Sequence, residues 1–413
     1  MAGVLLWCLP NPGELRAQHL LVPMDDVQAN HLKAYGVTYR TIAEGQDAEW
    51  LLNHRGGSFL LPDTESIRRE LALEGVTSEP LDPSGLQSVR DAMEAARTDA
   101  IPLESTPRIA VYAPPGTPPW DDAVTLALEY AGVPYERIWD GEVIRDGLEA
   151  WDWVHLHHED FTGQYSKFYL TYAGSDWMME EVERNEAMAA ELGFSDVPAL
   201  KRAVAVEIRD FVEAGGFLFA MCTATETLDL ALASHSTDIA ASYANGRPPD
   251  PDASERMDWS RALAFRDARV ETSASVTAFS DIDSHQVNTP ARQALGSFTL
   301  MEFSSRVDPV AAMLVQNHVS VIDDFYGQTT AFRADRLRPD AVVLAREGDW
   351  VKYVTGELGE GVWTFYGGHD PEDPEHQVGD APTNLDRFPN SPGYRLILNN
   401  ILFPAARPEP LPT

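Results

Sequence analysis

Short runs of apolar residues alternate with amphipathic segments along most of this chain. In its middle part, four strand-like segments are each followed by a stretch with the apolar spacing of a helix: residues 108–113, 135–140, 153–158 and 217–222. The first of them, at 108–113, is continuously apolar from its second residue on. A run that is apolar on both faces is typical of a strand inside a parallel sheet, and the following helix supplies a right-handed crossover. The pattern predicts an α/β fold with a flavodoxin-like, doubly wound, mostly parallel sheet.

The same alternation predicts a smaller α/β block before this sheet and further strands after it. The N-terminal block and its linker cover residues 19–104, and the main domain covers residues 107–405. An acidic, irregular stretch at about residues 236–297 is expected to be an insertion. Later strands are expected at residues 311–322, 340–347, 350–356 and 361–368, with a closing helix at 391–403.

The net charge of the chain indicates which classes of partner it can bind. Sixty-five acidic residues stand against 31 basic ones, which gives a net charge of −34. Such a chain repels nucleic acids and anionic membranes, so neither is expected as a partner. The acidic residues are spread along the whole sequence and lysine is rare, which favours a salt-adapted, halophilic protein.

The cysteines and the first 18 residues give information on disulfide bonds and on where in the cell the protein is located. The chain has 2 cysteines, Cys8 and Cys222, which excludes a disulfide framework as the basis of the fold. Residues 1–18 hold a short apolar run ahead of Ala17, which is either the remnant of an export signal or a frayed terminus. The apolar run favours an exported or periplasmic protein over a cytoplasmic one. No apolar run reaches the ~18 residues that a membrane span needs.

Cys222 ends the fourth apolar run, and a helical pattern begins directly after it at Thr223. In a parallel sheet, reactive groups gather where strands end at their carboxyl edge. The amino end of a helix stabilises a thiolate, and the Thr223 N–H could bind a developing oxyanion. The small residues Ala220 and Ala224 suit such a tight strand-to-helix turn. A buried thiol that only fills space is the alternative.

A thiolate that attacks a carbonyl needs a base and a group that orients the base. His369 follows the apolar run 361–368 and is therefore expected at the same edge of the sheet. Asp370 or Glu372 would hold its ring, and the sequence leaves the choice between them open. These residues predict a Cys-His-acid triad.

The third apolar run ends in a polar stretch that is expected to line the same pocket. Its candidate substrate-contacting residues are His157, His158, Glu159, Asp160, Gln164 and Tyr165. Gly163 is expected to supply a second oxyanion amide beside that of Thr223. His155, His157 and Glu159 could instead hold a metal ion. No further ligand motif completes such a site, so neither a metal nor another cofactor is expected.

The residues from Arg108 to the C-terminal helix resemble the class I glutamine amidotransferase-like superfamily. Its members have a flavodoxin-like sheet, a cysteine at a strand-to-helix elbow and a late histidine with an acidic partner. The stretches HLHHEDFTGQYSKFY, MCTATETLDLALA and YGGHDPEDPEHQVGDAPT are similar to a bacterial group often labelled asparagine synthetase B. The resemblance implies that Cys222 is the nucleophile and His369 the base. The elbow reads A-M-C-T-A where the superfamily usually has G-x-C-x-G, and the acid after His369 is displaced from the usual His-x-Glu.

No ATP-binding motif of the type G-x-x-x-x-G-K-[ST] or S-G-G-x-D-S occurs, so amide synthesis is not expected. The expected activity is thiol-dependent hydrolysis of a small-molecule amide, and a homo-oligomer stays open. One alternative is a non-catalytic sugar- or peptide-binding module of the trehalose-utilisation-like type. The other is a metal hydrolase that uses His155, His157 and Glu159.

Overall fold

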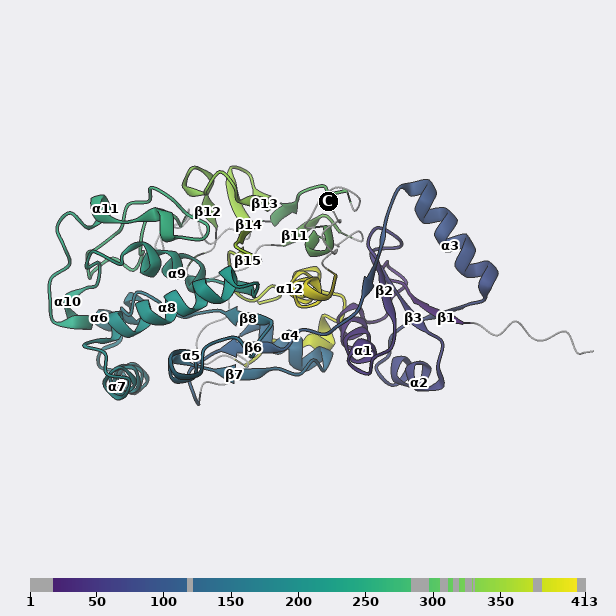
Figure 1. Cartoon of the computed structure of the whole chain (residues 1–413), viewed down its shortest axis with the longest axis horizontal. Helices are drawn as coiled ribbons and strands as arrows, with labels where there is room; N and C mark the ends of the chain where they lie inside the picture. Colours follow the sequence, from purple (N-terminus) through teal and green to yellow (C-terminus); the bar gives the residue numbers. More distant parts are fainter. Residues whose placement is uncertain are drawn as a thin grey trace, which may run out of the picture.

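The computed structural model contains two sheets, one in an N-terminal block at one end of the molecule and a larger one in the remainder (Figure 1). The structure describes residues 18–116, 122–283, 297–304, 311–314, 319–323, 329, 331–373 and 381–406. Within these ranges, none of the helices has both the length and the apolar character that crossing a membrane requires.

The N-terminal sheet has five strands, all paired antiparallel, in the order β4-β1-β3-β2-β5. They are β1 (His19–Val22), β2 (Ala48–Leu51), β3 (Ser58–Pro62), β4 (Glu79–Leu81) and β5 (Ala100–Leu103). Helix α3 (Pro83–Ala96) covers one face of the sheet through Val89 and Met93. Helices α1 (His31–Ala43) and α2 (Glu65–Leu73) bury their apolar sides in the core on the other face.

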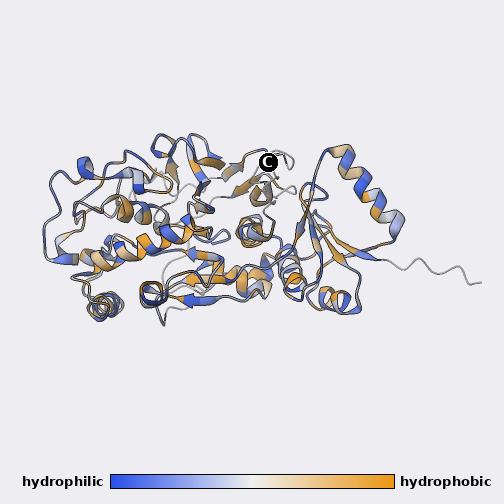
Figure 2. Ribbon diagram, viewed as in Figure 1, coloured by the Kyte–Doolittle hydropathy of each residue, from blue (hydrophilic) through white to orange (hydrophobic). Residues whose placement is uncertain are grey.

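The large sheet has ten strands in the order β11-β10-β13-β14-β15-β9-β8-β6-β7, with β12 paired to β14. The strands β7, β6, β8, β9 and β15 run parallel, whereas the remaining pairs are antiparallel. Their bounds are β6 (Ile109–Tyr112), β7 (Glu136–Ile138), β8 (Trp153–Leu156), β9 (Phe217–Met221), β10 (Ser297–Leu300), β11 (Val321–Asp323), β12 (Phe332–Arg333), β13 (Val342–Glu347), β14 (Trp350–Leu358) and β15 (Gly361–Tyr366). Figure 2 shows hydrophobic colouring along much of this sheet and mixed colouring on the outer helices.

Helices cover both faces of the parallel strands, with cores on each side. The helices of this part are α4 (Ala123–Ala131), α5 (Asp140–Asp146), α6 (Tyr169–Tyr172), α7 (Asp176–Glu191), α8 (Val197–Glu213), α9 (Thr223–Ala233), α10 (Ser242–Asn245), α11 (Ala253–Arg256) and α12 (Pro392–Leu402). Short 3₁₀ helices are η2 (Tyr165–Lys167), η3 (Trp259–Arg261), η5 (Ala311–Leu314), η6 (Ala334–Arg336), η7 (Leu385–Arg387) and η8 (Phe403–Ala406).

The predicted α/β class is confirmed in its general form, and the sheet as a whole is mixed. The strand expected at residues 311–322 is wrong in its first part, because Ala311–Leu314 forms η5. There the apolar residues pack against α12, where the Asn399 side-chain amide donates to the carbonyl of Met313 at 3.2 Å. Only Val321–Asp323 joins the sheet, and residues 315–318 lie outside the described ranges.

The stretch at 236–297 is irregular where it is described, with only short helical turns and isolated bridges. Its last residue begins β10, which the sequence pattern did not predict. Residues 284–296 of the expected insertion lie outside the described ranges.

A buried arginine ties the N-terminal block to the main domain. Arg395 on α12 is fully buried and donates to the carbonyls of Met24 and Gly56 and to the Tyr35 hydroxyl. The same contact surface includes Gly36, whose backbone leaves room only for hydrogen: a Cβ would lie 1.7 Å from the carbonyl oxygen of Ala131. The two sheets are therefore joined by specific polar contacts as well as by a shared apolar core.

We expect Arg395→Met to lower the free energy of unfolding by about 2–4 kcal/mol, because it leaves two buried carbonyls without their charged donor. Urea denaturation measures this change. The control is Arg387→Met, which removes the same charge from an exposed position of η7 and should leave the midpoint nearly unchanged. Equal effects of both substitutions would contradict a specific role for Arg395.

Candidate active site

The register of three parallel strands brings the candidate residues to one edge of the large sheet. Leu156 of β8 pairs with Ala220 of β9, and Met221 of β9 pairs with Tyr366 of β15. These strands therefore end at nearly the same level. His157 and His158 follow β8, and Cys222 and His369 lie one and three residues beyond their own strands.

Cys222 occupies a strained elbow between β9 and α9. Its φ is 51° and its ψ is −136°, a combination that residues with a side chain rarely adopt. The Ala224 N–H, in the first turn of α9, donates to the carbonyl of His157 at 3.0 Å, which fixes the turn against the end of β8. The Cys222 side chain is 2% exposed, and its Sγ lies 3.6 Å from the Thr223 hydroxyl. The backbone thus has the form that sequence reasoning required of an elbow.

We expect Cys222→Gly to be at least as stable as Cys222→Ala. At an ordinary buried position glycine would be the less stable, but here it relieves strain of roughly 1–3 kcal/mol, which exceeds the ~0.8 kcal/mol of one lost methyl group. Urea denaturation of the two variants makes the comparison. An alanine variant more stable by about 1 kcal/mol would show that the elbow is unstrained.

Three histidines meet beside this elbow. The Nε2 atoms of His158 and His369 lie 2.8 Å apart, so one ring donates a hydrogen bond to the other. The ring of His157 stacks on that of His158 with centroids 3.7 Å apart, and it lies 4.7 Å from that of His369. Burial, together with the neighbouring His158, lowers the pKa of His157 to about 4, so its ring is neutral at pH 7.

Asp122 adds a carboxylate that the sequence analysis missed. It caps α4 by accepting from the Val124 and Thr125 amides, and its other oxygen faces His155 Nε2 at 3.1 Å. His155 Nδ1 also faces an acceptor, the Phe219 carbonyl, at 3.0 Å. The His155 ring thus lies between the Asp122 carboxylate and the Phe219 carbonyl. The aspartate directly before the apolar helical pattern at 123–131 was the available signal.

The pKa of Asp122 agrees with this arrangement. Burial alone would raise it, but the facing rings of His155 and His157 outweigh burial and hold the pKa well below its usual range. The predicted metal set of His155, His157 and Glu159 does not form as a group. Among the described residues, His155 and His157 cluster with Asp122 instead.

The two acids expected to orient His369 serve other partners. Asp370 is buried and accepts from the Tyr394 hydroxyl at 2.7 Å, the Thr383 hydroxyl at 2.8 Å and the Glu372 amide at 2.9 Å. Burial raises the pKa of Glu372, whose carboxylate interacts with Ser391. In the described part of the chain neither carboxylate is hydrogen-bonded to the His369 ring, and His158 takes that position.

Residues 160–165 shape the loop after β8. Asp160 accepts from the backbone amides of Thr162, Gln164 and Ser166, and burial raises its pKa. The Gln164 side chain donates to the Thr162 hydroxyl and accepts from the Ala241 amide, which ties the loop to the irregular stretch. These contacts give Asp160 and Gln164 a structural role in the loop.

Gly163 and Tyr165 lie in the same loop. The Gly163 N–H donates to the Asp160 carbonyl at 3.0 Å, so this amide is already used and does not serve as the expected oxyanion donor in this conformation. Gly163 has a φ of 71°, and a Cβ there would lie 2.7 Å from the backbone of Pro198, so it is required for packing against α8. Tyr165 is buried with a φ of 52°.

A second charged group lies beside this loop. Lys201 on α8 is buried, contacts Asp140 at 3.0 Å and lies 3.7 Å from the carboxylate of Glu159. Burial raises the pKa of Glu159, and Lys201 opposes that rise. Glu159 is thus held by a lysine that the sequence analysis did not single out.

Glu226 lies in the first turn of α9 and accepts from the hydroxyls of Ser280 and Thr329. Thr329 in turn accepts at its carbonyl from the Gly368 amide, next to His369. Burial raises the pKa of Glu226 from 4.5 to about 7. The native chain therefore keeps a proton on Glu226 that the unfolded chain loses above pH 4.5.

We expect Glu226→Gln to stabilise the chain at pH 8 but hardly at pH 5. Since the folded pKa is raised, the ionised carboxylate destabilises the native state progressively between about pH 4.5 and 7, by about 3 kcal/mol above that window. Urea denaturation of wild type and variant at the two pH values gives the difference. A difference that does not change with pH would contradict a buried, proton-binding Glu226.

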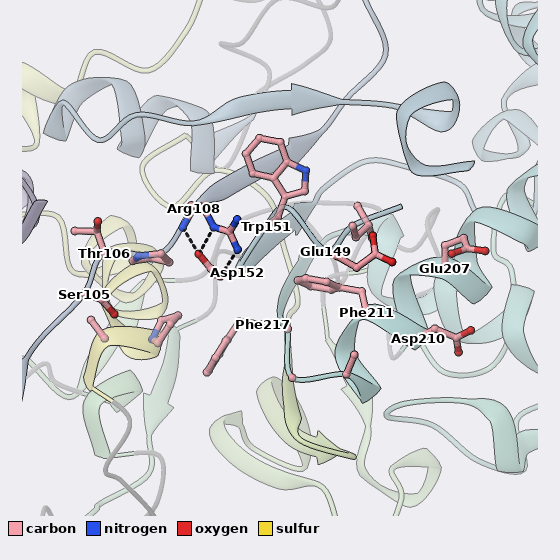
Figure 3. A pocket seen from close by; sticks show the side chains of 17 residues that line it. Ser105, Thr106, Arg108, Glu149, Trp151, Asp152, Glu207, Asp210, Phe211 and Phe217 are labelled. Atoms are coloured by element: carbon pink, nitrogen blue, oxygen red, sulfur yellow. Dashed lines mark hydrogen bonds and ion pairs between the residues drawn. The ribbon is translucent and has the colours of Figure 1, made fainter. Parts of the chain in front are cut away.

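A hollow in the surface lies away from these residues. A cavity of about 620 Å³ opens at the amino ends of the parallel strands, beside Arg108, Asp152 and Phe217 (Figure 3). Arg108 is paired with Asp152 at 2.8 Å. None of the described residues that line this cavity is a cysteine or a histidine. We therefore place the candidate site at the carboxyl edge, where Cys222 and the three histidines follow the ends of neighbouring strands.

Comparisons with known proteins assign no family. No family model matches the chain, and no curated protein matches it. Among solved structures, it is similar to the Cytoplasmic Protein STM3548 from Salmonella typhimurium, with 12% identity over 73% of this chain and 100% of that chain and a TM-score of 0.35. It is also similar to Exo-beta-1,4-mannosidase Op5Man5 from Opitutaceae bacterium strain TAV5, with 12% identity over 82% of this chain and 41% of that chain and a TM-score of 0.30. TM-scores this low carry no functional argument.

Proposed function

We propose that this protein hydrolyses a small amide through the thiol of Cys222. The observation that carries the proposal is the backbone of Cys222, a residue with a side chain held at a φ of 51° between a parallel strand and a helix. Strain of this kind costs free energy and persists where the surrounding structure imposes it, as it does at the nucleophile of an elbow.

The order of the parallel strands supports a flavodoxin-like assignment within this proposal. Counted along the chain from β6, the order β7-β6-β8-β9-β15 is 2-1-3-4-5, the order of flavodoxin-like sheets. The class I glutamine amidotransferase-like resemblance implies the same sheet, with the nucleophile at a strand-to-helix elbow. Cys222 follows β9, which is the fourth of these strands.

In the proposed reaction the Cys222 thiolate attacks the carbonyl carbon of the substrate and His369 takes the thiol proton. His369 then returns this proton to the leaving amine, and water releases the acyl group. His158 takes the place of the acid, because its Nε2 lies 2.8 Å from that of His369 and fixes the ring. The Thr223 amide, at the first turn of α9, is the proposed oxyanion donor.

The surroundings favour a small, uncharged substrate. Cys222 and His157 are both buried, so the substrate must reach an enclosed edge of the sheet. A net charge of −34 and the nearby carboxylates of Asp122 and Glu159 repel an anionic substrate. Neutral primary amides therefore fit this edge better than acidic ones.

The experiment combines alkylation of the thiol with an assay of amide hydrolysis, in a Cys8→Ser background where Cys222 is the remaining thiol. We expect iodoacetamide to react with a pH midpoint below the ~8.5 of a free thiol, because the helix terminus stabilises the thiolate. Cys222→Ala should lower ammonia release from a panel of small amides by at least about 1,000-fold.

His369→Gln should also abolish turnover, whereas His235→Gln, at an exposed histidine after α9, serves as the matched control. A thiol midpoint at or above 8.5 with no hydrolysis of any amide would overturn the proposal. If a sugar or peptide then raised the melting temperature equally in wild type and Cys222→Ser, the chain would be a binding module.

A further inference from the structure

The second cluster at this edge is built from imidazoles alone. His157, His158 and His369 each offer a ring nitrogen, and these three atoms lie within 4.8 Å of one another. The rings come from the ends of β8 and β15, two strands of the sheet that lie on either side of β9. We propose that these histidines form a binding site for a divalent transition-metal ion, with Zn²⁺ as the best fit.

His157 is the residue that points to a ligand. It is 2% exposed, and among the described residues neither of its ring nitrogens has a hydrogen-bond partner. A buried polar group without a partner costs roughly 1–3 kcal/mol, and coordination of a cation would satisfy it. Asp122 lies 3.6 Å from His157 Nδ1, the side on which a carboxylate supports a metal-binding imidazole. Nε2 is then left for the ion.

The rings of His158 and His369 must separate slightly and turn to complete the site. Two nitrogens on a tetrahedral ion with bonds of about 2.0–2.1 Å lie about 3.3 Å apart. The observed Nε2–Nε2 distance of 2.8 Å is that of a hydrogen bond between the rings. An ion would replace this shared proton, while the two nitrogens move apart by about half an ångström and the rings turn so that both lone pairs point at the ion.

The ligand set selects the class of metal. Neutral imidazoles bind Zn²⁺, Cu²⁺, Ni²⁺ and related ions, whereas Mg²⁺ and Ca²⁺ require oxygen ligands. Three protein ligands leave a fourth position open on a tetrahedral ion. The histidine cluster therefore differs from the acidic surface of the protein, where exposed carboxylates would bind Mg²⁺ or Ca²⁺ weakly.

This inference deepens the proposed function at one point, His369. When its Nε2 donates to His158, the single lone pair of the neutral ring lies on Nδ1 and can take the Cys222 proton. When Nε2 binds an ion, Nδ1 carries the ring proton and cannot act as the base. If both proposals hold, Zn²⁺ at this site suppresses hydrolysis by Cys222. Metal binding itself does not depend on the thiol chemistry, so the two proposals fail separately.

The experiment titrates the metal-free full-length chain with Zn²⁺ and Co²⁺ by calorimetry, and follows Co²⁺ by its visible absorption. We expect one Zn²⁺ per chain and the intense absorption of tetrahedral Co²⁺, with no comparable binding of Mg²⁺. His157→Gln and His158→Gln should each weaken binding at least 10-fold. His235→Gln, which alters an exposed histidine outside the cluster, should bind like wild type.

Asp122→Asn tests the support that a carboxylate gives to His157. Asparagine still caps α4 but removes the charge behind His157, so Zn²⁺ affinity should fall by about 10–100-fold. Because the substitution also removes the charge that faces His155, the affinity is measured under conditions where circular dichroism shows the variant to be folded. Absence of saturable binding, or binding unchanged in both histidine variants, would overturn the metal site. Zn²⁺ binding with an inert Cys222 would refute only the thiol hydrolase, and thiol hydrolysis without Zn²⁺ binding would refute only the metal site.

Discussion

The candidate site depends on the parallel register of β8, β9 and β15. Aromatic side chains stabilise this register. Trp153 pairs with Phe217 at the start of the strands, and the Trp153 ring stacks on that of Phe219 with centroids 5.8 Å apart. Since side chains alternate along a strand, a slip of one residue would turn His155 and His157 to the opposite face. The polar contacts at the carboxyl ends of these strands therefore depend on the apolar packing of Trp153 and Phe217 at their amino ends.

That edge carries an unusual number of buried ionisable groups, and the chain pairs them locally. Lys201 lies against Asp140, and three of the four lysines of the sequence, Lys167, Lys201 and Lys352, are buried. Lys167 donates to the carbonyls of Glu271 and Ala278 and so holds the irregular stretch against the main domain. In this chain of net charge −34, most of the lysines are therefore buried, and most of the charged surface residues are arginines, aspartates and glutamates. This distribution suits a protein whose surface carboxylates are screened by salt.

The sequence predicted the parallel strands well because each is a continuous apolar run followed by a helix, as at 108–113 and 217–222. It placed Cys222 and His369 at one edge by the same logic. It failed where the decisive contact is not local: no pattern around His369 says that Asp370 faces Tyr394 while His158 meets the ring. Asp122 was missed for the same reason. Its position before a helical pattern indicates a helix cap, but nothing near it in the sequence indicates that its carboxylate also faces His155. At Ala311–Leu314 a local pattern misled the prediction. The sequence is typical of a strand, but the segment packs against α12 as a 3₁₀ helix.

The elbow and the histidine cluster make different demands on the same few residues. A site built only for metal gives no reason to hold a non-glycine residue at a φ of 51°, since none of the three imidazoles needs that strain. A site built only for thiol chemistry gives no reason to bury His157 with Asp122 3.6 Å from Nδ1 and no hydrogen bond at Nε2 among the described residues. Each feature costs free energy, and neither explains the other. Both features lie at the ends of β8, β9 and β15, and a dual role of His369 would explain both. In the metal-free state it would be the base for Cys222, and in the metal-bound state it would be a ligand beside His157.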